Sequence, residues 1–202
     1  MLHLTNLLNN NRAWAEQQTT RDPEFFSRLC AIQRPNYLWI GCADSRVPAN
    51  TIIGLDPGEV FVHRNVANVV SPYDRNCLAV VQYAVDVLKV TDIIICGHYR
   101  CGGVQAALGP HTTEPLEGWL TPIRTLCSTH VVELASMSNE TVKWNRLCEL
   151  NVISQVRTLA QSPTLIDAWA RGQAVTIHGW IYDLHDGLIR DLDVSTEKPI
   201  HK

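Results

Sequence analysis

Two short apolar runs, residues 37–40 and 93–96, are each followed by side chains that can bind a metal ion. The first run leads into C-x-D-x-R at 42–46, and the second leads into H-x-x-C at 98–101. Runs of this length, rich in β-branched and aromatic residues, predict buried strands. Residues 75–90 carry apolar side chains at three- and four-residue spacing, which predicts a helix between the strands. This order predicts a parallel pair of strands, with both motifs at their carboxyl ends, where open α/β sheets place their sites.

The two motifs together offer a donor set that suits zinc. Two thiolates, an imidazole and a carboxylate, from Cys42, Cys101, His98 and Asp44, can complete a tetrahedral Zn²⁺ site. A purely structural zinc site is one alternative, although such sites are usually built from paired C-x₂-C motifs, which this sequence lacks. A second alternative is that Cys42 and Cys101 are simply buried thiols, as cysteines often are.

Arg46 favours a catalytic metal site over a structural one. If the chain stays extended beyond residue 41, then Cys42, Asp44 and Arg46 point to the same side, because alternate residues of a strand share a face. The guanidinium can then hold the Asp44 carboxylate in a bidentate, charge-assisted pair. We therefore expect Asp44 to have two states. It lies either on zinc, with the site closed, or on Arg46, with a position open for water, as catalytic zinc requires.

The whole pattern predicts an α/β fold: a mainly parallel β-sheet with an antiparallel edge strand, flanked by helices on both sides. Residues 174–182 and 188–194, joined by a turn at Asp186-Gly187, predict a terminal hairpin. Helices are predicted at 117–135 and 145–171, with breaks at a polar stretch near residues 136–140 and at Ser162-Pro163. We expect one domain over residues 1–202, with a helical N-terminal arm at 1–34, a zinc-binding α/β body at 35–194 and a flexible tail at 195–202.

Composition excludes several classes of partner. The formal net charge of the 202 residues is -3 with no basic stripe, which argues against nucleic-acid binding. No run of about 18 apolar residues is present, so we predict no membrane-spanning helix. The N-terminus lacks the cationic and apolar regions of a secretion signal. Seven cysteines, an odd number without close pairs, indicate reduced thiols and a cytoplasmic location.

Five segments of the sequence resemble those of the β-class carbonic anhydrases, and in particular the bacterial type. They are CADSRVPA, FVHRNVAN, QYAVDVL, IIICGHYRCGGVQAA and VTIHGWIYDLHDG. The resemblance implies reversible hydration of CO₂ to bicarbonate and a proton by a zinc-bound hydroxide, with one Zn²⁺ per subunit. It implies that Cys42, Asp44, His98 and Cys101 are the zinc ligands and that Asp44 and Arg46 are the catalytic pair.

The same resemblance implies a substrate pocket and an oligomer. Phe61, Val66 and Tyr83 match the apolar lining for CO₂, although from the sequence alone Phe61 and Val66 are more typical of an ordinary core. Gln33 matches a position that reaches bicarbonate from a neighbouring subunit, which implies a homodimer, often paired again as a homotetramer. Backbone amides of Gly102 and Gly103, at a predicted helix N-terminus, can stabilise the developing bicarbonate oxygens.

Control by bicarbonate is a further implication of the resemblance. Trp39, Arg64 and Tyr182 match a non-catalytic bicarbonate site found in a bacterial subgroup of the family. Bicarbonate there favours the closed state, so we expect activity that falls steeply as the pH decreases, with cooperative inhibition by bicarbonate. The alternative is that Trp39 belongs to the core and Arg64 pairs with a carboxylate.

Two other functions remain open for this sequence. Hydrolysis of CS₂ or COS would use the same ligands on the same scaffold. A zinc-stabilised bicarbonate-binding protein without turnover is the non-enzymatic alternative, which the intact Asp44–Arg46 pair argues against. Two further histidines, His63 and His178, are interpreted as packing residues, with His178 in the core.

Overall fold

The computed structural model describes residues 2–200, which divide into two compact units corresponding to residues 1–34 and 35–202 of the chain. The first unit contains α1 (Leu2–Arg21) and α2 (Phe25–Ala31). Trp14 on α1 lies edge-on to the rings of Phe25 and Phe26, with ring centroids 6.3 and 5.8 Å away. These aromatic contacts hold the two helices of the first unit together.

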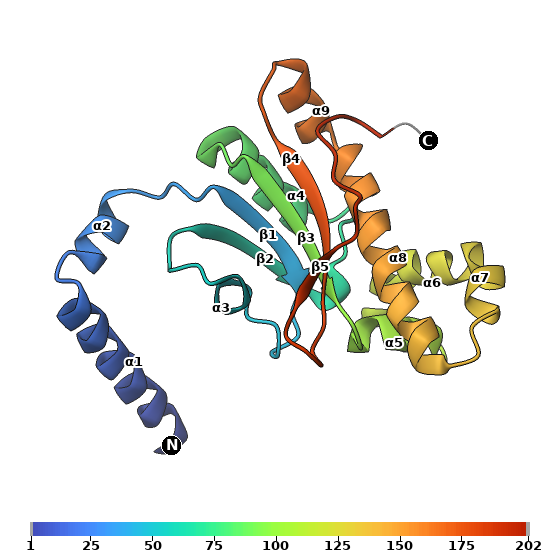
Figure 1. Cartoon of the computed structure of the whole chain (residues 1–202), viewed down its shortest axis with the longest axis horizontal. Coiled ribbons are helices and arrows are strands. Elements are labelled where there is room, and N and C mark those ends of the chain that lie inside the picture. Colours follow the sequence, from blue (N-terminus) through green and yellow to red (C-terminus); the bar gives the residue numbers. More distant parts are fainter. Residues whose placement is uncertain (1, 201–202) are drawn as a thin grey trace. The chain divides into compact units, whose positions relative to one another are not determined.

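A five-stranded sheet organises the second unit, in the order β2–β1–β3–β4–β5 (Figure 1). The pairs among β1 to β4 are parallel, and β5 pairs antiparallel with β4 at one edge. The predicted α/β fold and the predicted terminal hairpin are therefore confirmed. The strands are β1 (Tyr37–Cys42), β2 (Val60–Asn65), β3 (Asp92–His98), β4 (Thr176–Tyr182) and β5 (Ile189–Asp191).

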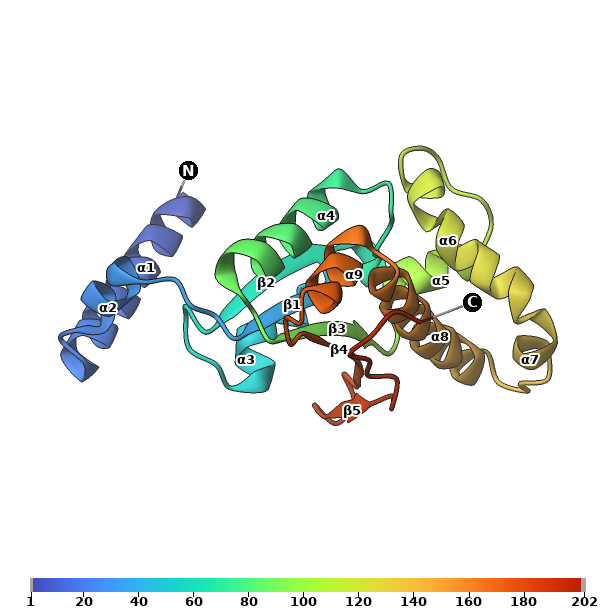
Figure 2. The ribbon, with the colours of Figure 1, turned by 90° about the horizontal axis from the view of Figure 1, so that it is seen from above.

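Helices cover both faces of this sheet (Figure 2). One face carries α4 (Arg75–Gln82) with its π-helical continuation η2 (Tyr83–Leu88), α8 (Glu140–Ala160) and α9 (Pro163–Ala170), and the other carries α3 (Ala49–Ile53). The remaining helices are η1 (Val66–Asn68), α5 (Gly102–Leu108), α6 (Leu116–Thr129) and α7 (Val131–Ala135). No helix within residues 2–200 is both long and apolar enough to cross a membrane.

Two predicted helix boundaries were wrong. The helix predicted to begin at residue 145 begins at Glu140, because the Asn139 side chain caps it by accepting a hydrogen bond from the Thr141 amide at 2.7 Å. The helix predicted at 117–135 is divided at His130 into α6 and α7. A polar stretch that was interpreted as a break is therefore in part a helix start.

The strand register brings the two ligand motifs to one edge of the sheet. Leu38 and Ile40 are fully buried against the helices on one face, and Trp39 and Ile94 are buried on the other, as in a sheet covered on both sides. Pairing between β1 and β3 ends at Gly41 opposite Cys96. The residues that follow each strand therefore emerge next to each other.

Glu117 in the first turn of α6 supplies a pH-dependent contribution to stability. Its carboxylate accepts hydrogen bonds from the Thr112 amide at 2.8 Å and from Arg124 at 3.0 Å, and it also pairs with His111. These contacts, the Thr112 amide first, lower the pKa of Glu117 from 4.5 to about 2. Because the folded-state pKa is lowered, the stabilisation is complete above pH 4.5 and is lost as the pH falls toward 2.

We therefore expect Glu117→Gln to lower the free energy of unfolding at pH 7 and to have a smaller effect at pH 3. Urea denaturation at the two pH values measures both differences. The control is Glu140→Gln, in the first turn of α8, whose side chain is 87% exposed and lies 3.7 Å from Lys143. Its effect should be small at both pH values, since exposed ion pairs contribute little. An effect of Glu117→Gln that is equal at pH 7 and pH 3 would contradict the interpretation.

Candidate metal centre

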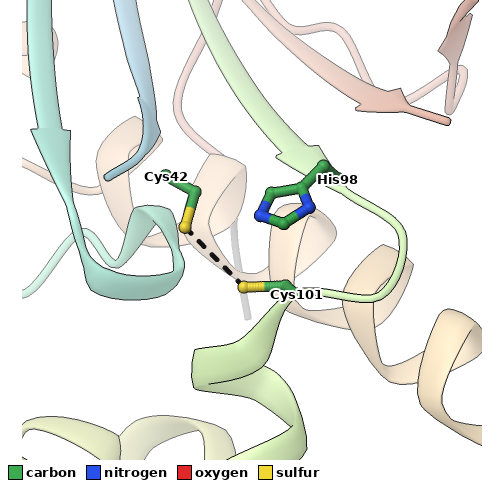
Figure 3. Close-up of side chains that lie close together, drawn as sticks. All are labelled: Cys42, His98 and Cys101. Atoms are coloured by element: carbon green, nitrogen blue, oxygen red, sulfur yellow. Dashed lines mark hydrogen bonds between the residues drawn. The ribbon is translucent and has the colours of Figure 1, made fainter. Parts of the chain in front are cut away.

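Three potential metal ligands meet where β1 and β3 end (Figure 3). Cys42 is the last residue of β1, His98 is the last residue of β3, and Cys101 immediately precedes α5. Their ligand atoms all lie within 4.8 Å of one another, and all three residues are buried. The Sγ atoms of Cys42 and Cys101 are 3.7 Å apart, and the ring of His98 lies beside them.

His98 presents a nitrogen without a partner to this cluster. Its Nδ1 lies 2.9 Å from the carbonyl oxygen of Tyr99, which can only accept, so Nδ1 carries the proton and Nε2 keeps its lone pair. Nε2 is fully buried and has no hydrogen-bond partner in the part of the chain that the structure describes. A buried polar atom left unpaired is costly, so this nitrogen fits a site that an ion fills.

The two thiols also fit a cation. The thiols of Cys42 and Cys101 lie within hydrogen-bonding distance of each other, and this contact lowers the pKa of Cys42 and raises the pKa of Cys101. Two buried thiolates at 3.7 Å repel each other, so ionisation of both sulfurs needs a positive charge beside them. A divalent metal allows both to be deprotonated. Two sulfurs and one imidazole nitrogen are ligands that Zn²⁺ prefers.

The Asp44 carboxylate lies on Arg46, beside the cluster. Arg46 Nε donates to Oδ1 at 2.9 Å, and Nη2 donates to Oδ2 at 2.7 Å. This bidentate pair holds the pKa of Asp44 well below its usual range. Oδ2 of Asp44 is 3.6 Å from Nε2 of His98, so the carboxylate remains next to the three close ligand atoms without being one of them.

The path of the chain between Asp44 and Arg46 differs from the expectation. The strand ends at Cys42, and the chain then turns, with the Val47 amide donating to the Asp44 carbonyl at 3.1 Å. The Arg46 amide donates to Asp44 Oδ1 at 2.9 Å, which is an Asx turn. The prediction of an extended chain through Arg46 was therefore wrong, because the Asp44 side chain bonds the backbone two residues on and ends the strand.

Arg64 on β2 holds the backbone of the first ligand motif. Its Nε donates to the carbonyl of Cys42 at 2.8 Å, and its Nη2 donates to the carbonyl of Asp44. Arg64 lies opposite Gly41 in the sheet, while Trp39 is fully buried and Tyr182 packs on the same face. Within residues 2–200 the partners of Arg64 are thus carbonyls rather than the carboxylate that we considered as an alternative.

The residues predicted to contact substrate are three apolar side chains, two glycines next to the metal ligands, and Gln33. Phe61 and Tyr83 place their ring centroids 5.8 Å apart, and Val66 and Tyr83 are 40% and 44% exposed, so neither Val66 nor Tyr83 is a core residue. A Cβ on Gly103 would lie 2.7 Å from Val66 Cγ1, whereas a Cβ on Gly102 would have nothing within 4 Å. The Gly102 backbone therefore borders open space. Gln33 belongs to the first unit, and its position is described only within that unit.

Sequence reasoning missed the support that α8 gives to the second motif. Trp144 Nε1 donates to the carbonyl of Cys101 at 2.9 Å, and the Asn145 amide oxygen accepts from the Arg100 amide at 3.3 Å. Arg100 itself has a φ of +56° and an exposed side chain. The first contact spans 43 positions of the sequence and the second spans 45, and no spacing in the sequence indicates either of them.

Comparison with known proteins gives a consistent family. A sequence model described as carbonic anhydrase matches residues 37–189. A carbonic anhydrase of Emericella nidulans is 47% identical over 94% of this chain and 83% of its own length. A tetrameric β-carbonic anhydrase of the ascomycete Sordaria macrospora has a TM-score of 0.93 and 41% identity, covering 97% of this chain and all of that one. The β-carbonic anhydrase CafA of Aspergillus fumigatus has a TM-score of 0.90 and 42% identity, covering 95% of this chain and 91% of its own.

These relatives correct one part of the resemblance that we drew from the motifs. All three are fungal, so the assignment to a bacterial, bicarbonate-regulated subgroup is not supported. The motifs that carried the finer assignment lie around the metal ligands, and ligand chemistry indicates the reaction rather than the subgroup.

Proposed function

Since the chain belongs to the carbonic anhydrase family, and to its β class, we propose that Asp44 and Arg46 are the catalytic pair of its reversible hydration of CO₂ to bicarbonate. Cys42, His98 and Cys101 would hold Zn²⁺, with Asp44 as the fourth ligand of the closed state. Zinc so bound would supply a nucleophile, because a divalent metal lowers the pKa of a bound water far below that of bulk water.

Asp44 in this proposal orients water and keeps the site open. While Arg46 holds the carboxylate, its Oδ2 faces the cluster and can accept a hydrogen bond from the attacking water, which directs the water's lone pair at CO₂. Because Arg46 keeps the pKa of Asp44 low, the carboxylate stays ionised and accepts hydrogen bonds rather than storing a proton. The bidentate pair beside the unpartnered His98 Nε2 is the observation that carries the proposal.

The remaining substrate contacts follow the predicted residues. Phe61, Val66 and Tyr83 would form an apolar wall for CO₂, which the partial exposure of Val66 and Tyr83 supports. The amides of Gly102 and Gly103 would bind the bicarbonate oxygens, which the open space beside Gly102 supports.

We propose that the protein is a homo-oligomer in which Gln33 completes the site of a partner subunit. The solved Sordaria macrospora relatives are described as tetrameric. Apolar side chains on α1, among them Leu4, Leu7 and Leu8, are more than half exposed in the single chain. Surfaces of this kind are typical of subunit interfaces, which supports a dimer that pairs again as a tetramer.

The experiment for the catalytic pair is Arg46→Gln. Loss of the bidentate hold frees Asp44 to occupy the metal site, so we expect CO₂ hydration to fall about 10–100-fold, the usual effect of removing a group that orients a metal ligand. Stopped-flow assays across pH 6.5–9 and the zinc content of the protein measure this, and zinc content should not change.

The matched control is Arg190→Gln, which removes a surface arginine that also pairs with an aspartate, Asp186, on the hairpin. Hydration by this variant should equal that of the wild type. Equal activity of Arg46→Gln and the wild type would contradict the proposed pair. Turnover of CS₂ or COS in place of CO₂ would contradict the substrate.

We also propose that bicarbonate inhibits the enzyme through Trp39, Arg64 and Tyr182. An anion that draws Arg64 toward itself would release the carbonyls of Cys42 and Asp44, and the freed segment could then close over the metal. This link between the anion and the ligand segment supports the proposal.

Arg64→Gln should therefore abolish cooperative inhibition by bicarbonate. It should also lower CO₂ hydration about tenfold, because the ligand segment loses two hydrogen bonds from a positioning group. Tyr182→Phe separates the two effects, since it changes the anion site and leaves the carbonyl contacts, and it should weaken inhibition more than turnover. Initial rates at increasing bicarbonate concentration measure both. Unchanged inhibition in both variants would rule the anion site out.

A further inference from the structure

A second hydrogen-bonded chain of polar groups lies at the end of the sheet opposite the metal centre. Asp92 is the first residue of β3, of which His98 is the last. Asp92 Oδ1 lies 2.9 Å from Nε2 of His178, and Nδ1 of His178 lies 3.0 Å from Oγ of Ser195. None of these side chains takes part in the metal centre, so the chain of contacts is independent of it.

The hydrogen bonds fix the role of each group. The Asp92 carboxylate can only accept, so His178 Nε2 carries the proton and Nδ1 offers its lone pair to the Ser195 hydroxyl. Thr91 Oγ1 donates to the other oxygen of Asp92 at 2.7 Å and orients the carboxylate. A hydroxyl, a base and a group that orients the base are the components of a nucleophilic triad. In serine proteases Nδ1 of the histidine faces the carboxylate and Nε2 faces the serine, whereas here Nε2 faces Asp92 and Nδ1 faces Ser195. The neutral tautomer protonated at Nε2 permits this arrangement.

The chain of contacts is both held in place and accessible. Thr196 exchanges two backbone hydrogen bonds with Ile177, at 2.9 and 3.0 Å, and thereby fixes Ser195 next to β4. Ser195 is exposed, and the side chains of His178 and Asp92 are 23% and 32% exposed. The prediction that His178 is a core residue was therefore wrong, because its side of β4 faces the segment around Ser195 rather than a packed layer.

Ser195 lies between two cavities of different character. A cavity of about 440 Å³ is lined by Thr176, Thr196, Glu197 and Lys198 together with Ser195. The second, of about 270 Å³, is lined mainly by the aliphatic side chains of Ile153, Val156, Val194 and Ile200, and also by Arg157 and Thr196. The aliphatic side chains of the second cavity suit an aliphatic acyl group, and each cavity has one cation in its lining, Lys198 or Arg157, which suits an oxygen on which negative charge develops.

We propose that Ser195, His178 and Asp92 form a second active site, which hydrolyses small neutral carboxylic esters. Ser195 Oγ attacks the ester carbonyl while its proton passes to His178 Nδ1, and the carbonyl oxygen becomes an oxyanion in the cavity that Lys198 helps to line. The C–O bond to the alcohol then breaks, and His178 returns the proton to the leaving alkoxide. Water, deprotonated by the same nitrogen, hydrolyses the acyl-serine, so that one ester and one water give one acid and one alcohol.

The test compares p-nitrophenyl butyrate hydrolysis and CO₂ hydration in the intact, zinc-loaded protein. Ser195→Ala should lower ester hydrolysis at least about 100-fold, the lower limit expected for loss of such catalysis, and should leave CO₂ hydration unchanged. Asp44→Ala should do the reverse, which separates this site from the metal centre and from the function proposed there. Butyrate should react faster than acetate, because aliphatic side chains form most of the lining of the second cavity.

Labelling gives a readout that a structural role of the contacts would not produce. A fluorophosphonate should modify one serine per subunit, identified by peptide mass spectrometry as Ser195, and should not label Ser195→Ala. Asp92→Asn keeps the side-chain shape and should lower ester hydrolysis at least about tenfold, because the base loses its orienting carboxylate. The proposal is overturned if Ser195→Ala hydrolyses the ester as fast as the wild type, or if Ser195 is not labelled.

Discussion

Replacing Cys42 by Ser is expected to release zinc and to lower CO₂ hydration by at least about 1,000-fold, because water without the metal keeps a pKa far above neutral. Cys42 lies 3.7 Å from Cys101 at the end of β1, and its sulfur also accepts from the Ala67 amide at 3.4 Å. A hydroxyl at this position is a poor ligand, since serine stays protonated where the thiol becomes a thiolate. Zinc content by mass spectrometry and stopped-flow hydration measure the two losses.

The control for Cys42→Ser is Cys77→Ser. Cys77 on α4 is as buried as the ligand cysteines, but desolvation raises its pKa to about 12, so it remains a neutral thiol. This variant should unfold at a lower temperature, because a buried hydroxyl replaces a sulfur, and it should bind zinc and hydrate CO₂ as the wild type does. Full zinc content in Cys42→Ser would show that the metal lies elsewhere.

The sequence predicted those parts of the site that follow directly from strands. Two apolar runs and a helix between them place Cys42 and His98 at the same sheet edge, and the register of β1 and β3 agrees. The bidentate contact of Asp44 with Arg46 was also expected, although by another backbone path. A strand pattern indicates which residues alternate, but it does not indicate that an aspartate will bond its own backbone and turn the chain.

Contacts between segments that are distant in the chain could not be predicted from the sequence. The bond from Trp144 to the Cys101 carbonyl and the bonds from Arg64 to the Cys42 segment depend on how elements pack, and no local spacing encodes them. Ser195 and His178 meet for the same reason: a single β-bridge between Thr196 and Ile177 brings a polar segment, expected to be a loose tail, beside β4. Motifs thus predicted the ligands, whereas packing determines what orients them.

Asp44→Ala is the variant that decides whether this metal centre depends on a moving carboxylate. We expect CO₂ hydration to fall by about 10²–10⁴-fold, the range for loss of a positioned side chain that hydrogen-bonds the reacting group. Zinc should remain, because Cys42, His98 and Cys101 supply three ligands and Asp44 lies on Arg46 rather than among them. Inhibition by bicarbonate should disappear as well, since no carboxylate is left to close the site.

Asp44→Asn separates charge from shape in this experiment. The amide oxygen can still accept from the Arg46 backbone amide, so the unfolding temperature should stay closer to that of the wild type than in Asp44→Ala. The neutral amide cannot form a charged pair with the guanidinium, so CO₂ hydration should fall nearly as far as in Asp44→Ala. A purely structural zinc site predicts the opposite pattern, with altered stability and unchanged turnover in both variants. Three measurements on the two variants distinguish a catalytic zinc site from a structural one: zinc content, stopped-flow hydration rates and thermal unfolding. Only a catalytic site links CO₂ turnover to the charge at position 44.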